Sequence, residues 1–279
     1  ALYSRVYLYM GEWQKCIDYS TKVIGDKTYA LTEPENYKNY FINCTKEKET
    51  IWNLAYLDNE SGPGLATMIT LEPDGCWAEE GYSPTILEDM GKGTILESVD
   101  ARWDFVGPGH AKNGLWLVEC TKHSFQGGKK ALNSPPVFRL SEIYFNRAEA
   151  YAMLNKDSEA LADINAVREK RMKENAQAYI WKDSDAVKAG SMVELVLKEK
   201  RIEFPFEYQR WYDLLRHNKD LIRNFWDFHT SEYLGVSQPG VPGLDKEGVV
   251  VKYTDNFFIW PIPNTEITNN HLCKQNHGY

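Results

Sequence analysis

The sequence predicts a mainly α fold of helical hairpins, with small β elements and long loops. Two stretches, residues 5–24 and 139–171, carry apolar residues at helical spacing, and each is broken once by a turn. Between them, from about residue 25 to 138, turns rich in glycine and proline alternate with short strand-like runs such as "TIWNLAY" and "LWLVEC". These observations indicate a helical framework that carries one long irregular insert.

The second of these hairpins has the clearer pattern. Its two helices each repeat apolar residues on one face: Leu140, Tyr144, Ala148 and Tyr151, then Ala160, Ile164 and Val167. The sequence Asn155-Lys156-Asp157 interrupts the pattern, and Asp157 or the following Ser158 can cap the second helix. The stretch therefore predicts two antiparallel helices joined by a tight turn.

The hairpin at residues 1–24 keeps the same register. Aligning residues 5–24 with residues 149–168 places turn on turn and small residue on small residue: Tyr7 on Tyr151, Gly11 on Asn155, Cys16 on Ala160, Ser20 on Ile164 and Val23 on Val167. This spacing resembles that of tetratricopeptide repeats, and two unrelated hairpins are the alternative. Because stacked repeats need neighbours, we expect the chain to be the C-terminal part of a longer protein.

A third helical block follows at residues 191–218. Ser191 and Glu194 have the spacing of a capping box, and Pro205 ends the helix that they begin. A further helix is expected at residues 207–218, and the remaining tail is rich in loops. The sequence thus divides into a hairpin at 1–24, an irregular insert at 25–138, hairpins at 139–218 and a loop-rich segment at 219–279.

Composition limits the classes of function. The 279 residues are 43% apolar and carry a net charge of -8, which argues against a nucleic-acid partner. No apolar run reaches the roughly 18 residues that a membrane span needs. The five cysteines form no CxxC pair and the six histidines no HxH or HxxxH spacing, so we expect neither a metal site nor a disulfide framework. No nucleotide-binding or nucleophile-elbow motif is present, and we expect no cofactor.

Three stretches together resemble the signature of SusD/RagB-type proteins. They are "RLSEIYFNRAEAYAMLNKDSEALADINAVREKR" at residues 139–171, "VLKEKRIEFPFEYQRWYDLLR" at 196–216 and "FIWPIPNTEITNNHLCKQNHGY" at 258–279. Residues 75–102 resemble the family more loosely. The chain departs from the family pattern at Lys200, where arginine is usual, at Tyr208, where glycine is usual, and at His277, where proline is usual.

The resemblance implies a right-handed superhelix of tetratricopeptide-like hairpins, with an irregular half that holds the ligand. It implies a lipoprotein exposed on the surface of the outer membrane, which binds glycans or, in some branches, peptides. Such proteins cover a SusC-type TonB-dependent transporter and are not enzymes. The resemblance also implies that an N-terminal half, with the signal peptide and the lipid-bearing cysteine, is absent, so membrane contact would come through that anchor.

Six charged residues in the third block favour a structural role: Arg201, Glu203, Glu207, Arg210, Asp213 and Arg216. Two carboxylates can form an acid and base pair, which is the catalytic alternative. Arginine forks, however, suit bidentate pairing with carboxylates on packed amphipathic helices, and the family uses these positions as ion pairs. We therefore expect structural ion pairs and no catalytic residue.

Aromatic residues are the candidates for ligand binding, because flat rings complement the apolar faces of sugars. Trp77 lies in the glycine-flanked loop "DGCWAEEGY" with Asp74 and Tyr82 nearby, and Trp103 follows the D-x-R motif at Asp100. The other tryptophans in recognisable contexts are expected in the core: Trp52, Trp116, Trp211 and Trp260. Trp226, in a variable stretch, is left open.

These features favour a glycan-binding component of a nutrient-import complex that takes an oligosaccharide or polysaccharide and passes it to the transporter. The alternative is a tetratricopeptide-type adaptor for peptide or protein, which would present a polar groove lined by asparagine and lysine. A glycoside hydrolase is a third possibility, and it needs two carboxylates facing each other across an aromatic cleft.

Overall fold

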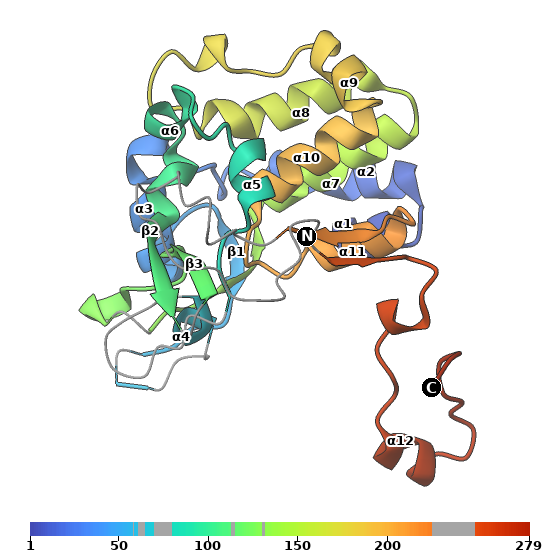
Figure 1. Ribbon diagram of the computed structural model, residues 1–279. Coiled ribbons are helices and arrows are strands. Elements are labelled where there is room, and N and C mark those ends of the chain that lie inside the picture. The colour runs from blue at the N-terminus through green and yellow to red at the C-terminus, as the bar shows by residue number, and fades with distance from the viewer. Residues whose placement is uncertain (58, 61–64, 70–79, 113–114, 130–131, 225–248) are drawn as a thin grey trace.

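The computed structural model describes residues 1–57, 59–60, 65–69, 80–112, 115–129, 132–224 and 249–279. Helices dominate this part of the chain, and three two-stranded sheets accompany them (Figure 1). The prediction of a mainly α fold with small β elements is confirmed.

Seven helices form the framework: α1 (Leu2–Tyr9), α2 (Trp13–Ile24), α7 (Leu140–Met153), α8 (Asp157–Glu169), α9 (Asp183–Ala189), α10 (Met192–Glu203) and α11 (Arg210–Arg216). Helices α2, α7 and α8 lie side by side in this order, and α10 packs against both α7 and α8 (Figure 1). Most of the shorter helices belong to the insert: α3 (Tyr37–Ile42), α4 (Leu65–Ile69), α5 (Pro84–Asp89) and α6 (Leu96–Val99).

The turns of the first two hairpins have the same backbone geometry, as the repeat register predicts. Gly11 and Asn155, which occupy equivalent positions, both have left-handed φ values, of +71° and +56°. Asparagine and glycine are the residues that adopt this conformation at least cost. Cys16 and Ala160, the equivalent small residues, are fully buried where helices meet. The two hairpins therefore share a turn and a close-packing position.

Helix α10 joins the hairpins to the rest of the molecule. Its first turn is capped by Ser191, whose Oγ accepts a hydrogen bond from the backbone N–H of Glu194 at 3.2 Å. It ends one residue before the Phe204–Pro205 bond, as proline requires. Helix α11 starts later than predicted because Phe206 and Tyr208 have left-handed φ values of +60° and +58°, which no α-helix accommodates.

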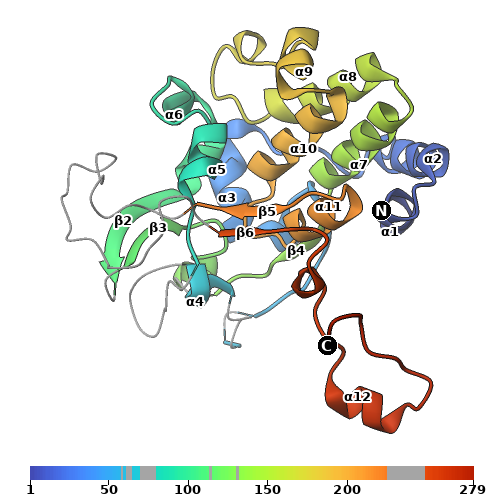
Figure 2. The ribbon, with the colours of Figure 1, turned by 45° about the vertical axis from the view of Figure 1, so that its right-hand side comes forward.

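The three sheets are all antiparallel pairs: β1 (Thr50–Asn53) with β4 (Pro136–Arg139), β2 (Val106–Lys112) with β3 (Leu115–Cys120), and β5 (Leu221–Arg223) with β6 (Val249–Val251). The first pair ties the start of the insert to its end, because Trp52 lies opposite Phe138. The third follows directly on α11 (Figure 2).

The C-terminal segment extends away from the helical body and carries α12 (Asn264–Asn269), as Figures 1 and 2 both show. Trp260, expected in the core, is 79% exposed there. That expectation is wrong for this chain, because the extended segment brings no second apolar layer over the ring. Trp211, on α11, is half-buried and stacks on Phe258 with ring centroids 4.6 Å apart.

Candidate functional site

The four residues predicted to bind a ligand have different positions. Trp77 and Asp74 lie outside the described residues. Tyr82 and Trp103 are 3% and 8% exposed and belong to one hydrophobic core between α5 and β3. The expectation that these two rings face a ligand is therefore corrected by their burial.

The backbone explains why Trp103 turns inward. Asp100 caps a short 3-10 helix at residues 101–105 by accepting a hydrogen bond from the N–H of Arg102, and the Arg102 side chain is itself held in a buried ion pair. The next side chain enters the core, where the Trp103 Nε1–H donates to the carbonyl of Met90 at 3.0 Å. Tyr82 packs edge-on against Phe206, with centroids 5.2 Å apart. Both rings are therefore buried parts of the hydrophobic core of the insert.

Trp52 shows the opposite error, because it was expected in the core and is 54% exposed. Its ring lies 6.2 Å from that of Phe138 on the neighbouring strand. The Arg5 guanidinium stacks 3.9 Å from the centre of the Phe138 ring, which leaves Phe138 only 7% exposed. A strand-like apolar run does not imply burial where the sheet has two strands and one open face.

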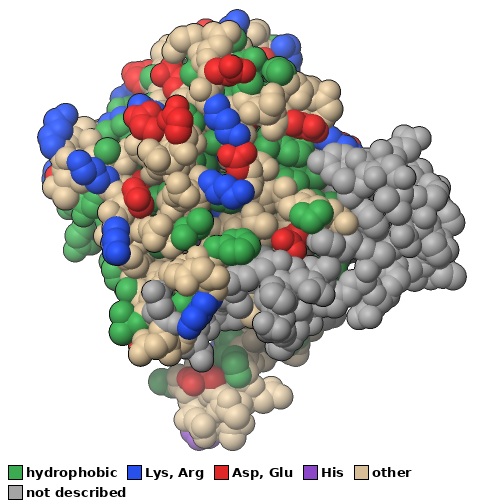
Figure 3. All heavy atoms as spheres, turned by 90° about the vertical axis from the view of Figure 1, so that its left-hand side faces the viewer, with side chains coloured by type: hydrophobic (Ala, Val, Ile, Leu, Met, Phe, Trp, Pro, Cys, Tyr) green, Lys and Arg blue, Asp and Glu red, His purple; other side chains and the backbone are tan. Residues whose placement is uncertain are grey.

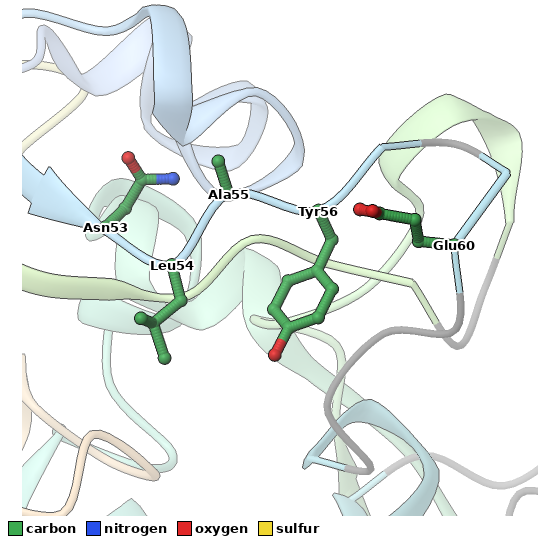
Figure 4. Close-up of a pocket in the computed structure, with 5 residues that line it drawn as sticks. All are labelled: Asn53, Leu54, Ala55, Tyr56 and Glu60. Carbon is green, nitrogen blue, oxygen red and sulfur yellow. The ribbon is translucent and has the colours of Figure 1, made fainter.

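Next to Trp52 the chain forms an open pocket of about 530 Å³, lined by Asn53, Leu54, Ala55, Tyr56 and Glu60. Figure 4 shows the Leu54 and Tyr56 side chains on one side of this stretch and those of Asn53 and Ala55 on the other. The Asn53 side-chain nitrogen is buried and has no hydrogen-bond partner among the described residues. The exposed ring of Trp52 next to this pocket offers a flat apolar surface of the kind that complements a sugar ring.

Two polar residues fix the backbone of this pocket. Ser134 Oγ accepts a hydrogen bond from the N–H of Tyr56 at 2.9 Å, and Gln126 Nε2 donates to the carbonyl of Tyr56 at 2.6 Å. Glu60 accepts from the N–H of Leu57 at 2.7 Å. The loop is therefore attached to the β4 side of the insert as well as to β1. Loops held in this way can present ligand-binding groups in a defined geometry.

Behind the pocket lies a buried network of charges that connects the insert to the helices. Its centre is Glu203 on α10, whose carboxylate lies 2.6 Å from the Arg139 guanidinium and 2.9 Å from that of Arg171. Both arginines also contact Glu49 of the insert, at 3.0 and 2.8 Å. The remaining members are Asp100, Arg102, Lys122, Arg168, Glu199 and Glu207, and nearly every side chain is at most 6% exposed.

The cations control the protonation of these carboxyl groups. Burial alone would raise the pKa of Glu203, but the charges of Arg171 and Arg139 outweigh it and hold that pKa well below its ordinary value. The pKa of Glu207 is likewise lowered by Arg139 and Lys122 against the effect of burial. Both groups are permanently ionised and paired, so neither suits the role of a proton donor in glycoside hydrolysis.

A second network joins α7, α10 and α11. Glu149 on α7 is fully buried and lies 3.0 Å from Lys200 and 2.6 Å from Arg216. Asp213 pairs with the same two cations, at 2.8 and 2.6 Å. Lys200, which replaces the usual arginine of the family pattern, thus keeps a cation between two carboxylates. Asp213 and Arg216 therefore lie in ion pairs in the structure.

The remaining two members of the predicted set differ from each other. Arg201 pairs with Asp89 on α5 at 2.5 Å and donates to Thr85 Oγ1 at 2.8 Å. Arg210 has no carboxylate within ion-pair distance among the described residues, so the structural ion pair expected at this position stays a prediction. It follows the two left-handed residues that delay α11, and this turn directs its side chain to a separate pocket.

Charged side chains of both signs are mixed over the described part of the face that Figure 3 shows, which is the face at the left of Figure 1. Within the described residues, no group of three or more His, Cys, Asp or Glu side chains is arranged to hold a metal ion. In the same part of the chain, no helix has both the length and the apolar character to cross a membrane.

A family model provides the deciding comparison, since the model of the SusD family matches residues 103–279. This chain belongs to the SusD family. Its similarity to the starch-binding protein SusD of Bacteroides thetaiotaomicron is 30% identity over 145 residues, which are 52% of this chain and 21% of that protein. A SusD-like protein of Formosa agariphila is 25% identical over 155 residues, 55% of this chain and 27% of that protein.

Solved SusD structures agree with the fold. A SusD superfamily protein of Bacteroides thetaiotaomicron superposes with a TM-score of 0.73 at 25% identity, covering 99% of this chain and 59% of its own. A SusD-like carbohydrate-binding protein of Bacteroides vulgatus gives 0.72 at 20% identity, covering 96% of this chain and 56% of its own. The chain thus spans less than two thirds of these SusD relatives.

Sequence reasoning missed most of the central network and the Trp52 pocket. Arg139, Arg171 and Glu49 lie in or near helical and strand patterns that give no sign of charge burial. The D-x-R motif at Asp100 and the arginine that opens the SusD signature at residue 139 were available signals. These two signals identify Asp100 and Arg139 as members of the network. The pairing of Glu49 with Arg139 and Arg171 is visible only in the folded structure.

Proposed function

We propose that this protein binds an oligosaccharide or polysaccharide at the cell surface and passes it to a SusC-like TonB-dependent transporter. In this proposal a lipid on a segment preceding the chain anchors the protein to the outer membrane. The SusD family match over residues 103–279 carries the proposal, and the name of the starch-binding relative supports a glycan as the ligand. Because the chain spans part of its relatives' length, these properties are proposed for the whole protein.

The aromatic surface of the insert is the proposed binding region. Trp77 and Asp74 remain the proposal drawn from the sequence, and the structure adds Trp52, Asn53 and Tyr56 as candidates with described positions. An exposed indole beside a half-open polar pocket can stack on a sugar ring while amide and carboxylate groups meet its hydroxyls. The buried network of Glu203 and its arginines supports this surface from behind.

The proposal includes binding without catalysis, and the state of two carboxylates supports it. Glu203 and Glu207 are paired with buried cations, and the proposal assigns them to structure. Purified protein should therefore bind glycans and release no reducing ends. Release of reducing ends that Glu203→Gln or Glu207→Gln abolished, with the fold intact, would contradict the proposal.

The test of function is a glycan array on the full-length protein, followed by titration calorimetry with the best ligand. Trp77→Ala and Trp52→Ala, measured separately, place the site: each should lower affinity about tenfold or more if its ring stacks on the sugar. Tyr253→Ala, which removes an aromatic side chain that is 46% exposed near β6, is the matched control. An array with no glycan bound would contradict the proposed function.

A further inference from the structure

A second pocket lies away from the Trp52 surface, between α5, α9, α10 and α11. It encloses about 200 Å³, and its charged lining consists of Asp89, Glu194, Lys198, Arg201 and Arg210. Helix α10 provides three of these side chains on one face, at positions 194, 198 and 201, spaced three and four residues apart. The pocket is therefore a fixed feature of the helical framework.

Both carboxylates of this pocket are already engaged. Asp89 bridges two cations, with one oxygen 2.5 Å from Arg201 and the other 3.5 Å from Lys198. Glu194 lies 2.5 Å from the Nζ of Lys219. Each acidic group is thus neutralised by a cation of its own surroundings, and neither lies within ion-pair distance of Arg210.

Arg210 is a cation of this pocket that has no direct ion pair among the described residues. Its side chain is half-buried. Burial, and then the charge of Arg201, lower its pKa, with Arg223 acting in the same direction and Asp213 and Asp89 opposing it. A guanidinium remains ionised even so, because its ordinary pKa is above about 12. A positive group that is partly removed from water and faces other cations favours the approach of an anion.

We propose that this pocket binds an anionic substituent of the glycan, a carboxylate or a sulfate, with Arg210 as the pairing residue. The proposal rests on the proposed glycan-binding function and adds a preference for acidic sugars. The planar fork of arginine matches both groups with two parallel hydrogen bonds. A pocket of about 200 Å³ has room for such a substituent, while the rest of the sugar stays outside.

Tyr208 favours a sugar over an acidic side chain as the carrier of the anion. It lies two positions before Arg210, is 71% exposed and occupies a left-handed backbone position where the family pattern has glycine. Neither its exposure nor its φ of +58° is explained by packing. An exposed phenol two positions before Arg210 in the chain offers a stacking surface in addition to an anion-binding group, and an acidic sugar can use both.

The experiment compares charged and neutral ligands of one shape. Nitrogen-15 NMR of the protein follows the arginine Nε–Hε signals during titration with glucuronate and with its uncharged methyl ester, and with galactose 6-sulfate and galactose for the sulfate case. Arg210→Gln assigns the signal and removes the site. Lys188→Gln is the matched control, since it removes a cation from neighbouring α9 whose side chain is 75% exposed.

We expect the Arg210 signal to shift with an acidic sugar and not with its neutral counterpart. Arg210→Gln should weaken acidic-sugar binding about tenfold or more, and Lys188→Gln should change it little. Equal shifts with charged and neutral sugars, no shift of Arg210 with either acid, or equal losses in the two variants would each overturn the proposal. Glycan binding on the array that does not depend on Arg210 would leave the proposed function standing, so the two failures are distinguishable.

Discussion

The surroundings of Glu203 and of Arg210 differ in how their charges are balanced. Glu203 lies in a buried group of paired charges, and its own carboxylate meets three arginines at 2.6 to 3.5 Å. Arg210, on the next helix, is half-buried beside Arg201 and has no carboxylate partner among the described residues. Balanced buried charges fix the position of the insert on the helices. Arg210 does not fix the insert in this way, and its position in a pocket is the reason for proposing that it binds a ligand.

The largest effect is expected from removing Arg171, which is fully buried between Glu49 and Glu203. Arg171→Ala removes one of the two arginines that Glu49 and Glu203 share, and the free energy of unfolding should fall by about 3–5 kcal/mol. Urea unfolding followed by circular dichroism measures this change. Lys188→Ala, at an exposed ion pair, should change stability by less than about 0.5 kcal/mol. A similarly small loss for both variants would remove the contrast between the two regions.

The second largest loss of stability should come from lowering the pH, through His123 beside the buried charge network of Glu203. Burial lowers the pKa of this histidine to about 3, against the opposing charge of Glu207. A group whose pKa is lower in the folded state contributes its full stability above the unfolded value of about 6.5, and this contribution is lost as the pH falls toward 3. Between pH 7 and pH 5 the loss at His123 should be about 2 kcal/mol.

The variant that isolates this effect is His123→Gln, which keeps a polar partner for Asn133, now 3.3 Å from the ring. Its stability should change less than that of the wild type between pH 7 and pH 5. The lowered pKa of Glu203 acts in the same direction but below its ordinary value of about 4.5, outside this window. Parallel pH profiles for the two proteins would contradict a role for His123.

The exposed aromatic residues of the insert should behave in the opposite way. Trp52→Ala should leave the melting temperature nearly unchanged, because the ring is 54% exposed and fills no cavity. If Trp52 stacks on a sugar, affinity should fall by about 1–3 kcal/mol, or roughly one to two orders of magnitude. Calorimetric titration of both proteins with one glycan measures the difference. A marked loss of stability with unchanged affinity would place Trp52 with the structural aromatics.

The sequence was a good guide to the helices and a poor one to burial in the insert. Gly11 and Asn155 could be matched because a helical hairpin repeats its turn and its close contact at fixed spacing. Trp52, expected in the core, is exposed and Trp103, expected at the ligand, is buried, because the burial of each ring depends on which side of the insert meets the rest of the fold. Helix α9 was missed for a related reason, as its short polar sequence has few apolar residues.

The charged positions have a similar limit. A run of acidic and basic residues on amphipathic helices predicts that ion pairs form, but pairing depends on residues far away in the chain. Glu203 finds its partners at positions 139 and 171, whereas Arg201 finds Asp89 on α5. Arg210, which follows two left-handed residues, has no ion pair in the part of the chain that the structure describes. The spacing of the motif contains no information about that turn.

The smallest expected effect concerns Tyr208, and it separates strain from packing. A tyrosine at φ +58° is strained by about 1 kcal/mol, whereas glycine adopts this conformation freely. Tyr208→Gly should therefore raise the free energy of unfolding by up to about 1 kcal/mol, reduced by the larger entropy of glycine in the unfolded chain. Because the side chain is 71% exposed, no packing is lost to offset this gain. Urea unfolding of the wild type, Tyr208→Gly and Tyr208→Ala measures it, and the alanine variant, which keeps the strain, should show no gain.

If the glycine variant is more stable and also binds acidic sugar more weakly, Tyr208 belongs with Arg210 among the residues that cost stability and serve the ligand. A glycine variant less stable than the wild type would mean that the phenol ring has packing partners, and Tyr208 would then belong with the balanced region around Glu203.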